Sequence, residues 1–407
     1  MDFNDTPEDA EFRAGVRTWL SANAEKRGPG QIYKAKYGEA ALIPLSQEWQ
    51  QKKFEAGFAG ITTPGEYGGR GGTPFQQAIY DQEEVNFLVP RHIGSGLPLV
   101  IPTLLVYGSE EVKQRFIPRI LRSDDLWCQL FSEPSAGSDL AGLRTRSARD
   151  GDDWIINGQK IWTSNAQHAD LAILVTRSDP DAEKHKGLTY FYLDMKTPGI
   201  EVRPIKQISG LANFNEVFLT DVRIPDSQRL GEVGEGWKVT ITTLMNERVT
   251  SGPRPAPDFE DIFGLAREVM IEDGPAIANG AIREKLADWY IKSRGVELTR
   301  MRTLTAMSRG QTPGPENSIS KLVSAFKRQE IALFGMDLLD MGGAMMSRET
   351  MPMRALFQEA ALDAPSGRIA AGTDEILRNI IGERVLGLPR EIRVDKDLPF
   401  RDLPTGI

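Results

Sequence analysis

The residues whose types best suit ligand chemistry lie in one short polar segment, Glu133–Asp139, with the sequence EPSAGSD. Its proline, glycine, serine and carboxylate residues are typical of a loop with a demanding backbone conformation. Because most side chains of such a loop are small, its backbone N–H groups and hydroxyls are exposed. We therefore expect it to hydrogen-bond a flat ligand with a polar edge that lies against a neighbouring sheet.

Strands are predicted on both sides of this loop, in the order strand, loop, strand, turn, strand. The turn is a charged segment at Arg149–Asp153. Further along, the dipeptide Asn157-Gly158 stands between two apolar runs and predicts a β-hairpin. The apolar runs are Trp127–Phe131, Trp154–Ile156 and Lys160–Thr163.

This region resembles the flavin-binding signature of the acyl-CoA dehydrogenase family, and the resemblance extends over nearly the whole chain. It is carried by SEPSAGSD in the loop and by NGQKIWTSNA after the turn. In that family the isoalloxazine ring of FAD lies against these strands. The resemblance implies that Ser138 lies near both the ring and the pantetheine arm of an acyl-CoA substrate. It also implies ring contacts from Phe131, Ser132, Trp162 and Ser164. The residues alone leave an ordinary hairpin with a buried tryptophan as the alternative.

The composition indicates a globular protein of more than one domain. The chain has 407 residues, of which 40% are hydrophobic and 26% charged, enough for two or three domains. Its net charge of −8 argues against a nucleic-acid-binding surface. Three histidines and a single cysteine, Cys128, argue against a zinc site and exclude an internal disulfide. No apolar run is long enough to cross a membrane and no signal peptide is recognisable, so we expect a reduced, cytoplasmic protein.

The alternation of helical and extended patterns predicts an α+β fold with three domains. Residues 1–125 read as helical, 126–230 as strand-rich and flavin-binding, and 231–407 as a helical bundle. Thr6 and Thr73 each begin a segment with the residues typical of a capped helix start. This plan resembles the acyl-CoA dehydrogenase fold, which has an N-terminal helical domain, a small β-barrel-like middle domain and a C-terminal four-helix bundle. Later helices are predicted at Trp237–Val249, Ile277–Ser308, Ile319–Met341 and Thr373–Leu386.

The resemblance implies dehydrogenation of an acyl-CoA thioester between its α and β carbons, with a trans-2-enoyl-CoA as product. This chemistry needs a base for the α proton, FAD N5 as the acceptor of the β hydride, and hydrogen bonds to the thioester oxygen. A carboxylate in an apolar cleft suits the base because burial raises its pKa. The implied acceptor of the electrons is an electron-transfer flavoprotein.

The resemblance points to Glu247 as the base. The commonest family pattern places a glutamate directly before a C-terminal Gly-Thr, but this chain has Ala371 there. A branch resembling isovaleryl- and long-chain-type dehydrogenases carries the glutamate on an earlier helix, before an arginine, as Glu247 and Arg248 stand here. Glu247 follows Leu244 by three residues, so it lies at the edge of an apolar stripe and can face a cleft. A solvated helix carboxylate and an inactive subunit are the alternatives.

The remaining implied contacts come from residues beside these two positions. Ala371 keeps a backbone N–H that can hydrogen-bond the thioester oxygen, and Gly372 follows it. Arg248 is implied to assist the CoA or the active-site region, and a surface cation is the alternative. Thr373 and Glu375 match family positions near the FAD adenosine, and Thr373 can also cap a helix.

The elements through which family subunits reach a neighbour's FAD are eroded in this chain. The Arg-x-x-Phe-Gly motif is missing between Gly264 and Leu286, and Leu339 replaces the glutamine of a glycine-rich motif. Both a homotetramer and an α2β2 heterotetramer with a second acyl-CoA dehydrogenase-like chain remain open.

The departures resemble bacterial FadE-type enzymes with flavin-site elements split between unlike subunits, which implies a bulky acyl group such as a steroid-derived one. From its position in the sequence, we expect Gly94–Thr103 to line part of the acyl pocket. A same-fold flavin oxidase or monooxygenase and a non-catalytic subunit are the rival functions.

Overall fold

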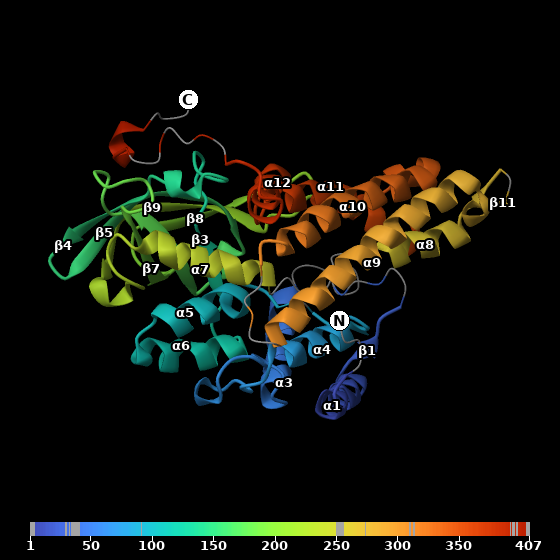
Figure 1. Ribbon diagram of the computed structural model, residues 1–407, viewed down its shortest axis with the longest axis horizontal. Coiled ribbons are helices and arrows are strands. Elements are labelled where there is room, and N and C mark those ends of the chain that lie inside the picture. The colour runs from blue at the N-terminus through green and yellow to red at the C-terminus, as the bar shows by residue number, and fades with distance from the viewer. Residues whose placement is uncertain are drawn as a thin grey trace. The chain divides into compact units, whose positions relative to one another are not determined.

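The structure, a computed structural model, places the chain in two compact units (Figure 1). It describes residues 5–28, 31, 33, 41–90, 92–249, 256–272, 274–308, 311, 314–390, 392, 395 and 398–403. The first unit comprises Met1–Trp49, Gly72–Arg91 and Ser251–Pro389, and the second comprises Gln50–Gly71, His92–Thr250 and Arg390–Ile407. Within the described ranges, no helix is long and apolar enough to cross a membrane.

Two helices of the first unit begin at the side-chain caps that the sequence predicts. The hydroxyl of Thr6 caps α1 (Pro7–Asn23), and Thr73 forms a reciprocal capping box before α4 (Pro74–Glu84). Two arginines of α1 form ion pairs with Glu83 of α4, at 2.7 and 2.9 Å, so the two helices pack together. The neighbouring elements are the antiparallel strands β1 (Glu25–Lys26) and β2 (Phe87–Leu88), and α3 (Leu42–Glu55), which is divided between the units.

The rest of the first unit is a set of helices around an apolar core. Figure 1 shows α9 (Gly280–Ser308) and α10 (Asn317–Leu338) as long orange helices, and α10 packs against both α9 and α11 (Leu356–Ile369). Phe357 of α11 is fully buried, and a Cβ at Gly335 of α10 would lie 2.2 Å from its ring, so the two helices meet closely there. Shorter elements are α8 (Phe259–Glu268), β10 (Met270–Ile271), β11 (Gly274–Pro275), α12 (Asp374–Ile380) and the π-helical turn η9 (Ile381–Val385).

The second unit is built on a seven-stranded sheet, drawn in green in Figure 1. Its strand order is β3-β6-β4-β5-β9-β8, with β7 paired to β6. Cys128 lies in β3 as predicted, where burial raises the pKa of its thiol to about 12. The strands are β3 (Trp127–Leu130), β4 (Arg146–Asp150), β5 (Asp153–Ser164), β6 (Leu171–Arg177), β7 (Leu188–Asp194), β8 (Ile200–Ile205) and β9 (Phe214–Pro225).

Helical segments of the second unit pack against one face of this sheet. Ile173 and Val175 of β6 belong to a core cluster with these helices, whereas Ala172 and Leu174 belong to a second cluster among the strands. This alternation follows from the two-residue period of a strand. The helical segments are the π-helical turn η2 (Gly96–Val100), α5 (Ile101–Tyr107), α6 (Glu110–Arg122) and α7 (Gly236–Val249).

The prediction of a hairpin at Asn157-Gly158 is wrong, because both residues lie inside the single long strand β5. The pairing of β5 with β9 shifts register at this point, which marks a β-bulge. The Asn157 side chain hydrogen-bonds the backbone N–H and the carboxylate of Asp221 on β9, each at 2.9 Å. A Cβ at Gly158 would lie 2.4 Å from Thr145, so only glycine fits there. Contacts with distant strands therefore give the dipeptide a different role from its usual turn.

Candidate active site

A buried ion pair holds the polar loop at its start. Lys160 of β5 is fully buried and donates to the carbonyl of Phe131 at 3.0 Å and to the Glu133 carboxylate at 2.8 Å. The same carboxylate accepts the backbone N–H groups of Arg144 at 2.6 Å and Thr145 at 2.9 Å. One carboxylate therefore ties together β5, the beginning of the loop and its return to the sheet.

The surroundings of this pair favour its ionised form. Burial lowers the pKa of Lys160, and the charge of Glu133 offsets part of this effect. Burial opposes ionisation of Glu133, but Lys160 and the neighbouring donors hold the pKa of its carboxyl below the ordinary value. Each charge satisfies the other, so the pair supports the loop and is not available as a catalytic acid or base.

The loop that Glu133 begins presents polar groups to solvent. Glu133 and Ala136 exchange backbone hydrogen bonds at 2.9 and 3.0 Å, which close a tight turn. Beyond this turn Ser138 is exposed, so its hydroxyl and backbone are accessible to a ligand. The carbonyl of Ser132, at the base of the loop, accepts the backbone N–H of Ile161 at 2.9 Å and joins it to β5. The ligand contacts of Ser132 and Ser138 stay predictions that this geometry supports.

Trp162 presents its ring to solvent, in contrast to the alternative of a buried core tryptophan. It is 57% exposed, and its backbone has a positive φ of 60° at a second register shift in β5. This irregularity turns the indole outward, two residues after the inward-pointing Lys160. The ring makes an edge contact with Phe214, and Ser164 nearby on the same strand is exposed. An exposed indole beside a hydroxyl suits a planar aromatic ring, so these residues fit the FAD that the resemblance implies.

Replacing Trp162 with alanine is expected to weaken FAD binding by about tenfold and to change the flavin spectrum, because a large aromatic contact is lost. Equilibrium dialysis and visible absorbance measure the two effects. The matched control is Trp162→Phe, which keeps an aromatic face and should retain most of the affinity. FAD retention and a spectrum unchanged in Trp162→Ala would show that the indole does not cover the flavin.

Helix α7, which carries Glu247, is anchored by buried hydroxyls. Thr243, four residues before Glu247, hydrogen-bonds Thr103 of α5 at 2.8 Å and Tyr190 of β7 at 3.0 Å. All three hydroxyl-bearing residues are fully buried. The side chains of Glu247 and Arg248 lie outside the described residues, although their backbone belongs to α7. The anchoring fixes the helix that carries Glu247, and the base role of Glu247 stays a prediction.

The other predicted residues belong to the first unit, in the turn between α11 and α12. Ala371 and Gly372 have positive φ values of 53° and 91°, and the Gly372 carbonyl accepts a hydrogen bond from Lys321 at 2.5 Å. Thr373 caps α12 by accepting the backbone N–H of Ile376 at 3.2 Å, which confirms its predicted capping role. Glu375 is exposed on the first turn of that helix. The substrate and adenosine contacts of these residues stay predictions.

The segment predicted to line the acyl pocket, Gly94–Thr103, forms η2 and the start of α5. A π-helical turn is rare and frequently occurs at functional sites. His92 stands two residues before this segment, and the residue as a whole is partly exposed. Both of its ring nitrogens are nevertheless buried and have no hydrogen-bond partner among the described residues. Burial lowers the pKa of His92 to about 3, so its imidazole is neutral at physiological pH.

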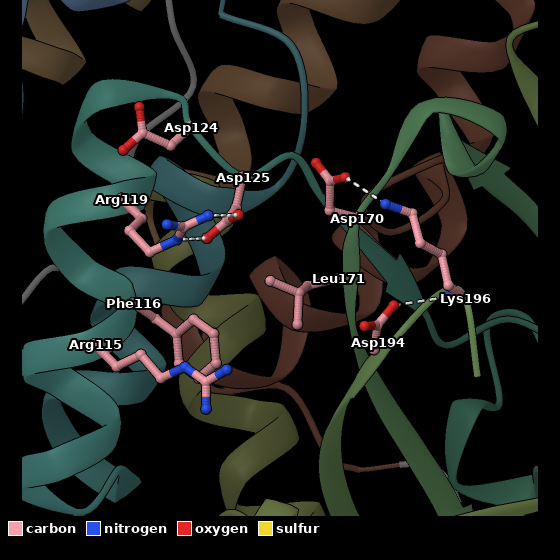
Figure 2. A pocket seen from close by; sticks show the side chains of 9 residues that line it. All are labelled: Arg115, Phe116, Arg119, Asp124, Asp125, Asp170, Leu171, Asp194 and Lys196. Atoms are coloured by element: carbon pink, nitrogen blue, oxygen red, sulfur yellow. Dashed lines mark hydrogen bonds and ion pairs between the residues drawn. The ribbon is translucent and has the colours of Figure 1, made fainter.

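Figure 2 shows a separate polar pocket of about 490 Å³. Asp124 and Asp125, which line it, precede β3, whereas the polar loop follows that strand. Arg119 binds Asp125 through two hydrogen bonds of 2.5 and 2.6 Å, and Lys196 pairs with Asp170 at 3.7 Å. Because these charges pair with one another, the pocket gives no basis for assigning a ligand. It is lined by Arg115, Phe116, Arg119, Asp124, Asp125, Asp170, Leu171, Asp194 and Lys196, none of which is a predicted site residue.

Sequence reasoning missed the residues that support this site. Glu133 and Lys160 stand inside the two quoted motifs, and their opposite charges in otherwise small or apolar surroundings were the available signal. For Thr103, Thr243 and Tyr190 no sequence signal exists, because each comes from a different element and hydroxyls are common on helices and strands.

Models of known protein families match nearly the whole chain. Residues 6–124 match the model described as acyl-CoA dehydrogenase, N-terminal domain. Residues 128–222 match the middle domain of that family, and residues 234–386 match its C-terminal domain.

Individual proteins of known sequence give the same result. The acyl-CoA dehydrogenase FadE34 of Mycobacterium tuberculosis is 37% identical over 386 residues, which cover 93% of this chain. This chain spans about half of that relative, since the match covers 51% of its length. The acyl-CoA dehydrogenase IpdE1 of the same organism is 35% identical over 398 residues and is matched over 98% of its length, with 94% of this chain covered.

Solved structures share the fold. The steroid ACAD Tcur3481-Tcur3483 has a TM-score of 0.78 and 25% identity, covering 96% of this chain and all of that one. The ChsE4-ChsE5 complex of Mycobacterium tuberculosis has the same TM-score with 27% identity, and the coverage is again 96% and 100%. A glutaryl-CoA dehydrogenase from Mycobacterium smegmatis, solved in complex with FADH2, has a TM-score of 0.70 and 23% identity, with 96% and 97% of the chains covered.

Proposed function

This chain belongs to the acyl-CoA dehydrogenase family of oxidoreductases, and from that premise we propose that it oxidises an acyl-CoA thioester to a trans-2-enoyl-CoA. The observation that carries the proposal is the assembly of the polar loop with β5. Its ionised support, Lys160 and Glu133, is buried, whereas the indole of Trp162 is exposed. Such an assembly presents a planar face and hydrogen-bonding groups at a fixed position on the sheet.

The proposed cofactor is FAD, bound by the middle domain, which we place at residues 126–230. Phe131, Ser132, Trp162 and Ser164 contact the ring, and Thr373 and Glu375 lie near the adenosine. When bound, FAD supplies the acceptor for the hydride that leaves the β carbon. Ser138 contributes to both the ring and the pantetheine arm of the substrate.

The chain's own residues handle the proton and the developing charge. Glu247 removes the α proton of the thioester, and its carboxyl then holds that proton. The backbone N–H of Ala371 hydrogen-bonds the thioester oxygen and stabilises enolate-like charge there, with Gly372 beside it. Arg248 assists the CoA region. Ala371 is exposed and has a positive φ, and both observations are compatible with this role.

The experiment that tests the proposed reaction is a panel of acyl-CoA thioesters assayed with an artificial electron acceptor. We expect one class of thioester to be converted to an enoyl-CoA, and the rate of acceptor reduction should rise with the thioester concentration until it saturates. The natural acceptor is proposed to be an electron-transfer flavoprotein. Rapid reaction of the reduced flavin with oxygen would instead favour the alternative of a flavin oxidase or monooxygenase on this fold.

For the substrate, we propose a bulky acyl group such as a steroid-derived one. The similarity to the steroid ACAD Tcur3481-Tcur3483 supports this class, together with the resemblance to enzymes whose flavin-site elements are split between unlike subunits. In the same panel, steroid side-chain thioesters are therefore expected to react faster than straight-chain ones. A preference for short straight chains would contradict the substrate class and leave the reaction type intact.

We also propose that this chain assembles with a different partner chain as an α2β2 tetramer. It lacks the arginine motif that reaches a neighbour's FAD, and Leu339 replaces the motif glutamine. In a homotetramer each FAD pyrophosphate would lose a charge-assisted contact of about 1.5–3 kcal/mol. A partner that retains these groups would restore the contact, and the similarity to the ChsE4-ChsE5 complex supports this arrangement.

The mass and FAD content of the chain purified alone test the assembly. We expect little bound FAD without a partner, and one FAD for each copy of this chain after co-expression. A stable homotetramer with one FAD per chain and full dehydrogenase activity would contradict the partner proposal and support the homotetramer alternative.

A further inference from the structure

The C-terminal strap, which we define as Leu398–Leu403, lies on the strand-bearing unit rather than ending free in solution. Pro399 forms a β-bridge with Glu183, and the backbone N–H of Phe400 donates to the carbonyl of Ala182 at 2.9 Å. Figure 1 shows this red segment near the green strands. The strap lies beyond residue 386, where the match to the family's C-terminal domain ends.

Phe400 is the buried anchor of the strap. Only 8% of the residue is exposed, and its ring covers the guanidinium of Arg177, with 3.7 Å between the guanidinium carbon and the ring centroid. The guanidinium of Arg144 lies at 5.5 Å from the same centroid. A cation over an aromatic face is attracted by the ring, more strongly when water is excluded. The ring therefore shields a cation that would otherwise meet water.

Arg177 connects this anchor to the polar loop. Its guanidinium donates to the carbonyl of Ala141 at 2.5 Å and to the carbonyl of Lys184 at 2.7 Å. The residue is 4% exposed, and burial lowers the pKa of its guanidinium to about 10. Its described hydrogen bonds thus join two segments of the chain. One carbonyl belongs to Lys184, and the other belongs to Ala141, just after the loop that contains Ser138.

Lys184 makes a second connection from the tail to the same loop. Its ammonium group lies 2.7 Å from a carboxylate oxygen of Asp139 and 2.7 Å from one of Asp395. Lys184 is 8% exposed, whereas the side chain of Asp139 is 64% exposed, so the bridge is buried on its lysine side only. Asp139 directly follows Ser138, and Asp395 belongs to the segment that leads into the strap.

The loop is therefore held at two ends by different parts of the chain. Its start is fixed by Glu133 and Lys160, which are buried in the sheet and do not involve the strap. Its end, at Asp139 and Ala141, is fixed through Lys184 and Arg177, both of which contact the C-terminal segment.

We propose that the strap positions Ser138 and Asp139 for the acyl-CoA substrate, with Phe400, Arg177 and Lys184 as positioning residues. This inference rests on the proposed function of the Ser138 loop in substrate binding. Loss of the strap removes the ring that covers Arg177 and so weakens the hold of Arg177 on Ala141 at the end of the loop, whereas the start of the loop stays in place. Substrate affinity then falls, whereas the ring contacts at Phe131, Ser132 and Trp162 persist.

The test compares the parent with Phe400→Ala and with a chain lacking residues 398–407, each prepared as the FAD-loaded complex. Hydrogen–deuterium exchange of peptides covering residues 134–144 should become about tenfold faster, the loss expected when a shielded cation–π contact is removed. KM for the best thioester should rise by about the same factor, with kcat and FAD content unchanged. Phe400→Tyr keeps the aromatic face and should behave as the parent.

Arg401→Ala is the matched control, because Arg401 lies next to Phe400 and its described side-chain contact is an exposed ion pair with Asp181. It should change neither exchange nor KM. Unchanged exchange of the 134–144 peptides in both strap variants would overturn the positioning role. Faster exchange with unchanged KM would overturn the link to substrate. The exchange result stands even if no thioester reacts, so failure of the proposed function is distinguishable from failure of the strap.

Discussion

Replacing Glu247 with glutamine is expected to lower turnover by about a hundredfold or more, the range for loss of a general base. Glutamine keeps the size of the side chain and removes its basicity, so FAD should stay bound. Stopped-flow reduction of the flavin by the best thioester measures the chemical step. The matched control is Glu235→Gln, since Glu235 is an exposed carboxylate next to the start of α7 and forms an ion pair with Lys238 at 3.7 Å.

Near-normal flavin reduction in Glu247→Gln would contradict the base assignment. Adding Ala371→Glu to the inactive variant provides a second readout. Because that position carries the glutamate in the commonest family pattern, the double variant should regain part of the lost rate. Recovery would show that the two positions serve one substrate carbon.

Replacing Lys160 with methionine is expected to destabilise the protein by about 3–5 kcal/mol, because Glu133 is then left as an unpaired buried charge. Because the Lys160–Glu133 pair also holds the polar loop on the sheet, the substitution should release the loop, and FAD should be lost. Urea unfolding measures the free energy. The control Lys186→Met removes an exposed lysine that pairs with Glu183 at 2.8 Å, and it should cost no more than about 1 kcal/mol.

The double variant Lys160→Met with Glu133→Gln separates charge burial from lost packing. The N–H groups of Arg144 and Thr145 bind different oxygens of the Glu133 carboxylate, so a glutamine oxygen can still accept one of them, and no charge remains unpaired. We expect the double variant to be more stable than Lys160→Met alone. Equal stability of the two would show that the penalty comes from packing and not from the unpaired carboxylate.

The pair also makes stability depend on pH in a defined direction. The pKa of Glu133 is lowered in the folded protein, so its stabilising contribution is present above the ordinary carboxyl pKa. That contribution is lost as the pH falls through the lower folded-state value. The parent should therefore lose more stability on acidification than Glu133→Gln does.

The sequence predicted the features that depend on local chemistry. Thr6, Thr73 and Thr373 cap their helices as expected, because a cap needs only a hydroxyl and the N–H groups of the next turn. The apolar run Trp127–Phe131 supplies β3 (Trp127–Leu130), as expected. The family resemblance and its fold are confirmed.

Features that depend on distant parts of the chain could not be predicted. The bulge at Asn157 is decided by Asp221 on another strand, whereas the local dipeptide alone indicates a turn. Helix α11 was missed because it contains Pro365, which usually ends a helix. The contact of Phe400 with Arg177 joins the end of the chain to the middle domain, and no local pattern at either residue indicates it.

The most direct test of the account is anaerobic mixing of the FAD-loaded protein, alone or with its partner, with the preferred acyl-CoA thioester. We expect the oxidised-flavin absorbance to be lost in a single turnover, with an acyl-CoA product lighter by two hydrogens. Glu247→Gln should greatly slow both changes. A flavin that stays oxidised with every thioester, in a complex with full FAD content, would contradict it.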